Sequence, residues 1–112
     1  MTTGDPKQIV QAPDHPPFLW WRGEVIPWDS ATVHLTMVGW SAISAVFEGI
    51  RAYWNPDDQE LYVFRLEDHL KRFAQSQRFM RMNQTYSRPQ LGEAITALFR
   101  ANGHRTDAYC QP

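Results

Sequence analysis

Apolar and polar positions change their spacing several times along this chain, and each change marks a predicted element. From Phe18 onward, the run FLWWRGEVIPW places Gly23 between two apolar, strand-like pieces, which predicts a tight hairpin. Residues 31–38, ATVHLTMV, alternate branched and polar side chains and predict a weak strand. Residues 39–50 are rich in small and apolar side chains, a pattern compatible with either a short helix or a buried loop.

A second hairpin and a helix are predicted next. The segments RAYW and LYVFR flank NPDDQE, a turn-forming cluster of Asn, Pro and Asp. In the following stretch, residues 66–82, Asp68 lies near the start, where a negative charge suits the helix dipole. Gln77 interrupts an apolar series whose spacing puts its members on one helical face; these are Leu66, Leu70, Phe73 and Met80.

The last helix carries the clearest local signals. Ser87 followed by Gln90 is a capping-box pattern, and Pro89 sits in the first turn, where proline is tolerated. Gly103 suits the C-terminal cap. An apolar stripe lies between these ends, formed by Leu91, Ala94, Ile95, Leu98 and Phe99. DAYCQP then begins a strand, so the predicted fold class is α+β, with antiparallel hairpins and two helices packed on the sheet.

Composition limits the class of protein. A length of 112 residues suits one domain, which we expect over residues 18–112, after a flexible, proline-rich lead-in at 1–17. A formal charge of -1 gives no electrostatic reason to expect nucleic acid or an anionic membrane as a partner. Cys110 is the only cysteine and no stretch reaches membrane-spanning length, so we expect a soluble, cytoplasmic protein.

Familiar catalytic and metal-binding motifs are absent from the sequence. The four histidines have no partner histidine at i, i+4 and no nearby cysteine, so no zinc site is expected. No glycine-rich phosphate loop is present. The five tryptophans are interpreted as core and interface filler.

Three local groupings remain as candidates for chemistry. Arg72 follows His69 by three residues on the predicted helix, which allows either a phosphate-binding guanidinium or a solvated surface arginine. VFEGIRAY places Glu48 and Arg51 around Gly49, which allows either a close backbone approach or an ordinary bend with a surface ion pair.

The third grouping lies in DAYCQP. It offers the Tyr109 hydroxyl and the Gln111 amide two residues apart, and in a strand both would point to the same face. Strand residues of this kind also commonly do no more than pack or meet water.

Taken together, four segments resemble the branched-chain aminotransferases of the fold-type IV pyridoxal-phosphate family. They are WWRGEVIPWDSATVHL, SAVFEGIRAYW, FRLEDHLKRFAQSQRFMRM and DAYCQP. The resemblance runs from about Phe18 to Pro112, and FEGIRAY in register with WxxGExxPW and HxxRF is its most specific part. It implies the N-terminal domain of such an enzyme, with pyridoxal 5'-phosphate as cofactor.

The resemblance also implies roles for single residues. Arg72 matches the helix arginine that holds the cofactor phosphate. Phe47, Gly49 and Arg51 match positions that line the substrate pocket, and Tyr109 matches a pocket tyrosine.

Two positions and the end of the chain depart from the family pattern. Ala42 stands where branched-chain enzymes place a pocket tyrosine, and Gln111 stands where they have an arginine linked to carboxylate recognition. Neither Lys7 nor Lys71 suits the Schiff-base role, so no catalytic residue is expected in this chain. We therefore expect a C-terminal, lysine-bearing domain beyond it.

The expected function of the full-length protein is transamination, from a branched-chain-like amino acid to a 2-oxo acid such as 2-oxoglutarate, in a homodimer. The chain alone is expected to be inactive. The alternatives are an amine transaminase or an aminodeoxychorismate-lyase-like enzyme of the same fold, or a non-catalytic truncated paralogue.

Overall fold

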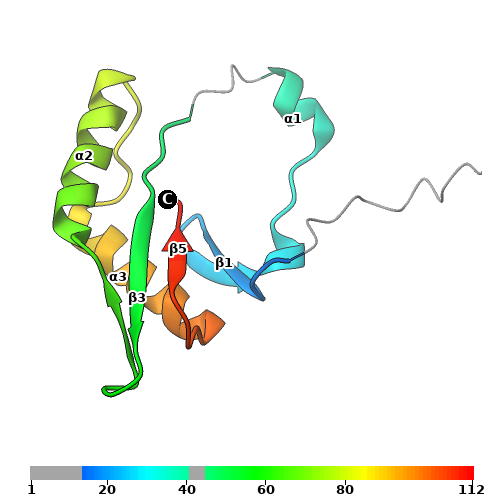
Figure 1. Ribbon diagram of the computed structural model, residues 1–112. Coiled ribbons are helices and arrows are strands. Elements are labelled where there is room, and N and C mark those ends of the chain that lie inside the picture. Colours follow the sequence, from blue (N-terminus) through cyan, green and yellow to red (C-terminus); the bar gives the residue numbers. More distant parts are fainter. Residues whose placement is uncertain (1–13, 41–44) are drawn as a thin grey trace, which may run out of the picture.

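The computed structural model describes residues 14–40 and 45–112, and over these it confirms the α+β class (Figure 1). The elements follow in the order β1 (Phe18–Trp21), β2 (Glu24–Pro27), the 3-10 turn η1 (Trp28–Ser30), α1 (Leu35–Trp40), β3 (Ile50–Asn55), β4 (Glu60–Val63), α2 (Leu66–Phe79), α3 (Arg88–Asn102) and β5 (Ala108–Cys110). The strands form two antiparallel sheets, β1-β2 and the three-stranded β4-β3-β5.

The first hairpin begins at Phe18, as predicted, and turns at Arg22 and Gly23. Both turn residues have positive φ, 49° and 93°, the combination that a type I′ hairpin turn requires. A glycine at the second turn position adopts this backbone without steric cost.

The second hairpin is also confirmed, with β3 and β4 joined through residues 56–59. The Asn55 side chain shapes this turn, because its Oδ1 accepts hydrogen bonds from the backbone N–H groups of Asp57 at 2.9 Å and Asp58 at 3.2 Å. Such an Asx turn is the local reason that the NPDDQE cluster reverses the chain.

The core lies between one face of β3 and the two long helices. Ile50 and Ala52 alternate toward this face and are fully buried. Leu70 from α2 packs with Ile95 and Phe99 from α3 against them. Burying these apolar side chains is what holds both helices on the sheet.

The ends of the long helices are set by local chemistry. The Ser87–Gln90 capping box is present in both directions, with bonds of 2.8 and 3.2 Å, and Gly103 caps α3 in the left-handed conformation. The prediction for α2 was wrong at its C-terminus. That helix ends at Phe79, so Met80 lies beyond it, is 48% exposed and does not join the buried face.

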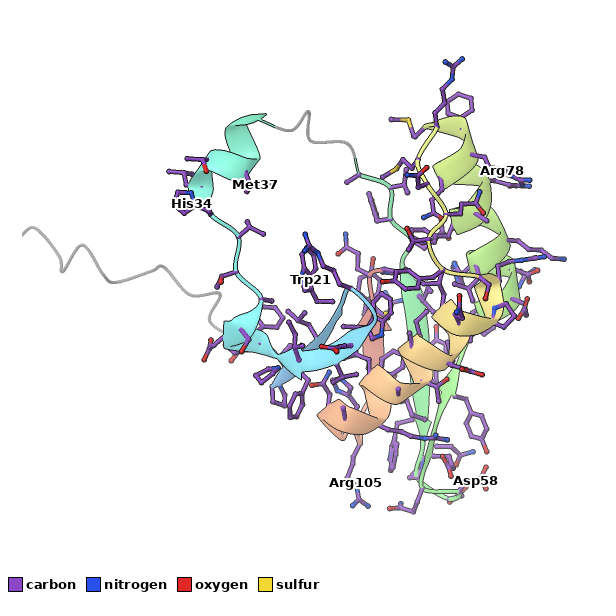
Figure 2. The ribbon with its side chains drawn as sticks, turned by 180° about the vertical axis from the view of Figure 1, so that it is seen from behind. Trp21, His34, Met37, Asp58, Arg78 and Arg105 are labelled. Carbon is purple, nitrogen blue, oxygen red and sulfur yellow. The ribbon has the colours of Figure 1, made fainter. Side chains whose placement is uncertain are left out.

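The predicted strand at 31–38 is also wrong, because α1 occupies Leu35–Trp40 instead. A strand needs a neighbouring strand to satisfy its backbone groups, and no described strand pairs with this segment. Local bonds form in its place: Met37 N–H donates to the His34 carbonyl at 2.9 Å, and Thr36 N–H meets His34 Nδ1 at 3.2 Å. Figure 2 shows Met37 on this helix and His34 just before it, both away from the sheet.

The first hairpin is joined to the far end of α3 by one side chain. The amide of Asn102 accepts from Phe18 N–H at 2.8 Å and donates to the Phe18 carbonyl at 3.0 Å. Asn102 thus pairs with the edge of β1 much as a neighbouring strand would.

Residues 1–13 of the expected lead-in lie outside the described residues. In the remainder, the ring of His15 stacks on Trp28 at 4.5 Å, and Trp28 N–H donates to the Pro17 carbonyl at 2.9 Å. The end of the lead-in therefore contacts the segment that follows the first hairpin.

Candidate functional site

The candidate site is built on a buried carboxylate, Glu48, which lies two residues before β3. Only 6% of Glu48 is exposed. His69 and Arg72, one turn apart on α2, both reach it. His69 Nδ1 lies 2.9 Å from Glu48 Oε1. Arg72 Nε donates to both carboxylate oxygens at 2.9 and 3.0 Å, and Arg72 Nη2 donates to Oε1 at 2.8 Å.

Charge strengthens this cluster. The hydrogen bond from Arg72 is the main cause that holds the pKa of Glu48 below its ordinary value. Burial works in the opposite direction, and the hydrogen bond from His69 adds to the lowering. The hydrogen bond between Arg72 and Glu48 also raises the pKa of Arg72 above its ordinary value. Both partners are therefore charged across the ordinary pH range.

The sequence did not predict that Glu48 contacts His69 and Arg72, and it suggested Arg51 as the ion-pair partner instead. A signal was available, because Glu48 alternates with Ile50 and Ala52 and so shares the face that packs against the helices. A carboxylate on the buried side of a strand requires a cation opposite it. Arg51 points to the other side and is exposed.

Arg72 keeps part of its hydrogen-bonding capacity free for a ligand. A guanidinium carries five N–H donors. Glu48 engages Nε–H and one N–H of Nη2, while 65% of the Arg72 side chain remains exposed. Two N–H groups on Nη1 and one on Nη2 are left. This outer edge suits a phosphate, which accepts paired N–H bonds.

Gly49 and Tyr109 meet next to this cluster. A β-carbon on Gly49 would lie 2.5 Å from the Tyr109 hydroxyl oxygen. Of the two possibilities that the sequence left open at this glycine, the structure therefore shows the close approach of another group to the backbone. Strand pairing places Arg51 directly opposite Tyr109. Phe47 precedes them and is 63% exposed. The structure thus gathers four of the residues expected to line a substrate pocket.

Of the other two expected substrate residues, one lies elsewhere in the structure and one is not described. Ala42 lies outside the described residues. Gln111 lies beyond β5, which ends at Cys110, so the strand does not place Gln111 on the face of Tyr109. Gln111 instead borders a largely apolar groove of about 580 Å³ between the first hairpin, α2 and α3.

The tryptophans are used in different ways. Trp20 packs edge-on against Tyr86 at 4.9 Å beside this groove, as expected for filler. Trp54 lies under the guanidinium of Arg105 at 5.6 Å, while Trp21 is 44% exposed at the hairpin end, where Figure 2 labels it.

Metal-binding clusters and helices suited to cross a membrane are both absent from residues 14–40 and 45–112. No group of three or more His, Cys, Asp or Glu side chains there is arranged to hold a metal ion. None of the helices in this part of the chain has the length and apolar character needed to cross a bilayer.

Comparisons with known proteins point to one group of enzymes, although no model of a protein family matches the chain. A branched-chain-amino-acid aminotransferase of Pseudomonas aeruginosa is 37% identical over 94 residues, which cover 84% of this chain and 30% of that protein. The branched-chain amino acid aminotransferase of Thermobaculum terrenum, crystallised in its PLP form, is 47% identical with a TM-score of 0.80, covering 86% of this chain and 31% of its own.

The Escherichia coli enzyme of the same name gives a TM-score of 0.76 at 31% identity, covering 87% of this chain and 31% of its own. The chain therefore spans about 30% of the length of the curated relatives it matches.

Proposed function

This chain belongs to the branched-chain amino acid aminotransferase family, and on that premise we propose that it supplies part of the active site of a pyridoxal-phosphate-dependent transaminase. The overall reaction moves an amino group from a branched-chain-like amino acid to a 2-oxo acid such as 2-oxoglutarate. The proposed enzyme is a cytoplasmic homodimer in which a further, lysine-bearing domain completes the site.

The observation that carries this proposal is the geometry of the Arg72 guanidinium. Its guanidinium is fixed from one side by a buried carboxylate and is open to solvent on the other. Bound pyridoxal phosphate supplies an electron sink for bonds at the amino-acid α-carbon. The role of Arg72 is to hold the phosphate through its outer N–H groups, which fixes the position of the whole ring.

The residues around Gly49 have the substrate-side role in the proposal. The absence of a side chain at Gly49 lets Tyr109 lie against the backbone, which supports a role for its hydroxyl in orienting a substrate. Arg51, opposite Tyr109, brings a cation to the same face of the sheet. Phe47 gives an apolar surface to an amino-acid side chain.

A second candidate is favoured by Gln111 and Ala42, which would replace a cation and a phenol in the pocket. A neutral amide binds a carboxylate less strongly than a guanidinium. An amine transaminase or an aminodeoxychorismate-lyase-like enzyme of the same fold would tolerate that loss. A comparison of amines with amino acids as donors, in an enzyme that contains this chain, separates the two candidates.

The phosphate role is tested by titrating an enzyme that contains this chain with pyridoxamine 5'-phosphate, which has no aldehyde to react with lysines. Each charge-assisted hydrogen bond to the phosphate is worth about 1.5–3 kcal/mol. Arg72→Ala should therefore weaken binding at least about tenfold, and Arg72→Lys should restore only part of it because an ammonium lacks the fork geometry.

The matched control is Arg78→Ala, on the same helix. Figure 2 shows Arg78 extending from α2 into solvent. This variant should bind as the wild type does. If Arg72→Ala binds with unchanged affinity, the phosphate assignment is refuted.

A further inference from the structure

A second residue of the phosphate site follows from the contacts of Arg72. We infer that Glu48 is a positioning residue: it holds the Nε edge of Arg72 so that the outer Nη edge is set for a phosphate before the phosphate arrives. His69 has the same role one step further back, since its Nδ1 contacts Glu48 Oε1 at 2.9 Å. This inference rests on the proposed function.

The number of contacts on Glu48 supports a fixed geometry. Both carboxylate oxygens lie within 3.0 Å of Arg72 Nε, and Oε1 also contacts Arg72 Nη2 and His69 Nδ1. Contacts at both oxygens prevent rotation of the carboxylate. A guanidinium bound to a carboxylate through Nε and Nη2 cannot rotate either, so its orientation is fixed by this fork.

Burial decreases in order along the cluster. Glu48 is 6% exposed, the His69 side chain 20% and the Arg72 side chain 65%. The carboxylate that holds the cluster is therefore buried, and the remaining N–H groups of Arg72 face solvent. An unheld arginine at 65% exposure would lose its rotamer freedom when a phosphate binds, and that loss weakens binding by about two- to tenfold for one long side chain.

The negative charge of Glu48 and its hold on Arg72 have opposite effects on the affinity for phosphate, so the two effects can be separated. A carboxylate repels a phosphate, so a role through charge alone predicts tighter binding when the charge is removed. A positioning role predicts weaker binding when the carboxylate keeps its charge but is withdrawn. Glu48→Asp makes that second change, because it shortens the side chain by one methylene.

The experiment is a titration of an enzyme that contains this chain, and of its variants, with pyridoxamine 5'-phosphate and, separately, with inorganic phosphate. Glu48→Asp should weaken both by about two- to tenfold, and Glu48→Gln should bind no tighter than the wild type. His69→Ala should also weaken binding, and His69→Asn should restore it because the asparagine amide nitrogen replaces Nδ1. The control is Asp68→Asn on the same helix, which breaks the exposed pair with the N-cap residue Arg65 and should change nothing.

A measurement without ligand guards against variants that are only partly folded. The Arg72 Nε–H proton should exchange slowly with water in the wild type, by NMR, and faster in Glu48→Asp while the core amides stay protected. Unchanged affinity and exchange in Glu48→Asp, or tighter binding by Glu48→Gln, would overturn the inference and leave the phosphate role of Arg72 intact. No loss in Arg72→Ala would overturn the proposed function and the inference with it.

Discussion

At Gly49, the ring of Tyr109 lies against the backbone where any other residue would carry its β-carbon. The distances from that position would be 2.5 Å to the hydroxyl oxygen, 3.0 Å to Cε2 and 3.1 Å to Cζ. Tyr109 is 57% exposed, so the ring has room to swing aside. The glycine therefore determines the position of the Tyr109 hydroxyl, and it has a smaller effect on the fold itself.

A double-mutant cycle tests this contact. Gly49→Ala should destabilise the chain by on the order of 1 kcal/mol, because overpacking forces Tyr109 out of place. The same substitution in a Tyr109→Ala background should cost almost nothing, because the ring is gone. Both free energies of unfolding are read from urea titrations. Equal costs in the two backgrounds would show that the contact does not govern this position.

The lowered pKa of Glu48 predicts how stability depends on acid. A carboxyl whose pKa is lower in the folded state than its ordinary 4.5 stabilises the fold fully above about pH 4.5. That contribution is lost as the pH falls through the lowered value, when Glu48 takes up a proton.

The comparison is between the wild type and Glu48→Gln, which cannot titrate at this position. The difference in unfolding free energy between them should shrink as the pH falls from 7 to 3. A difference independent of pH would mean that the carboxylate is not the stabilising group.

At the scale of elements, the sequence was informative wherever the cause is local. The Ser87 capping box and the Asn55 turn depend on neighbours within three residues, and both were predictable. The partner of Glu48 was not, because His69 and Arg72 lie 21 and 24 residues away and only the packing of α2 on β3 brings them together. The roles of Arg72 and Tyr109 came from family resemblance, since spacing alone left them open.

The prediction of a strand at residues 31–38 was wrong for a related reason. Its alternation is regular, but alternation predicts a strand only when another strand pairs with it. Leu35 is 81% exposed in α1, so neither a sheet nor a core in the described part of the chain selects for the alternating pattern.

The junction between the first hairpin and α3 gives the prediction at this scale. Asn102→Ala removes two hydrogen bonds to Phe18, each worth about 0.5–1.5 kcal/mol, and should lower stability by roughly 1–3 kcal/mol. Exchange of the Phe18 amide should accelerate more than that of the α3 amides. Asn83→Ala, at an exposed loop position, is the control and should be neutral. Equal effects of the two substitutions would contradict a bridging role for Asn102.

At the scale of the whole molecule, the chain should lack transaminase activity by itself. Lys71 is the lysine within the described residues, and it is exposed on α2 beside Arg72 in sequence. A lysine that bonds to the cofactor must be neutral and held against its aldehyde. Turnover of valine or leucine with 2-oxoglutarate should therefore not exceed a cofactor-only blank. Activity above that blank, lost in Lys71→Ala, would disprove the expectation.

The bridge between Phe18 and Asn102 also sets an order of events during synthesis. Its two ends are 84 residues apart, so the first hairpin leaves the ribosome long before its anchor exists. Closing so long a loop is entropically costly until α3 is in place. The bridge can therefore fix the first strand only after the last helix has formed, which is the reverse of their order of synthesis. Pulse-labelled hydrogen exchange should show α3 amides protected earlier than the amide of Phe18.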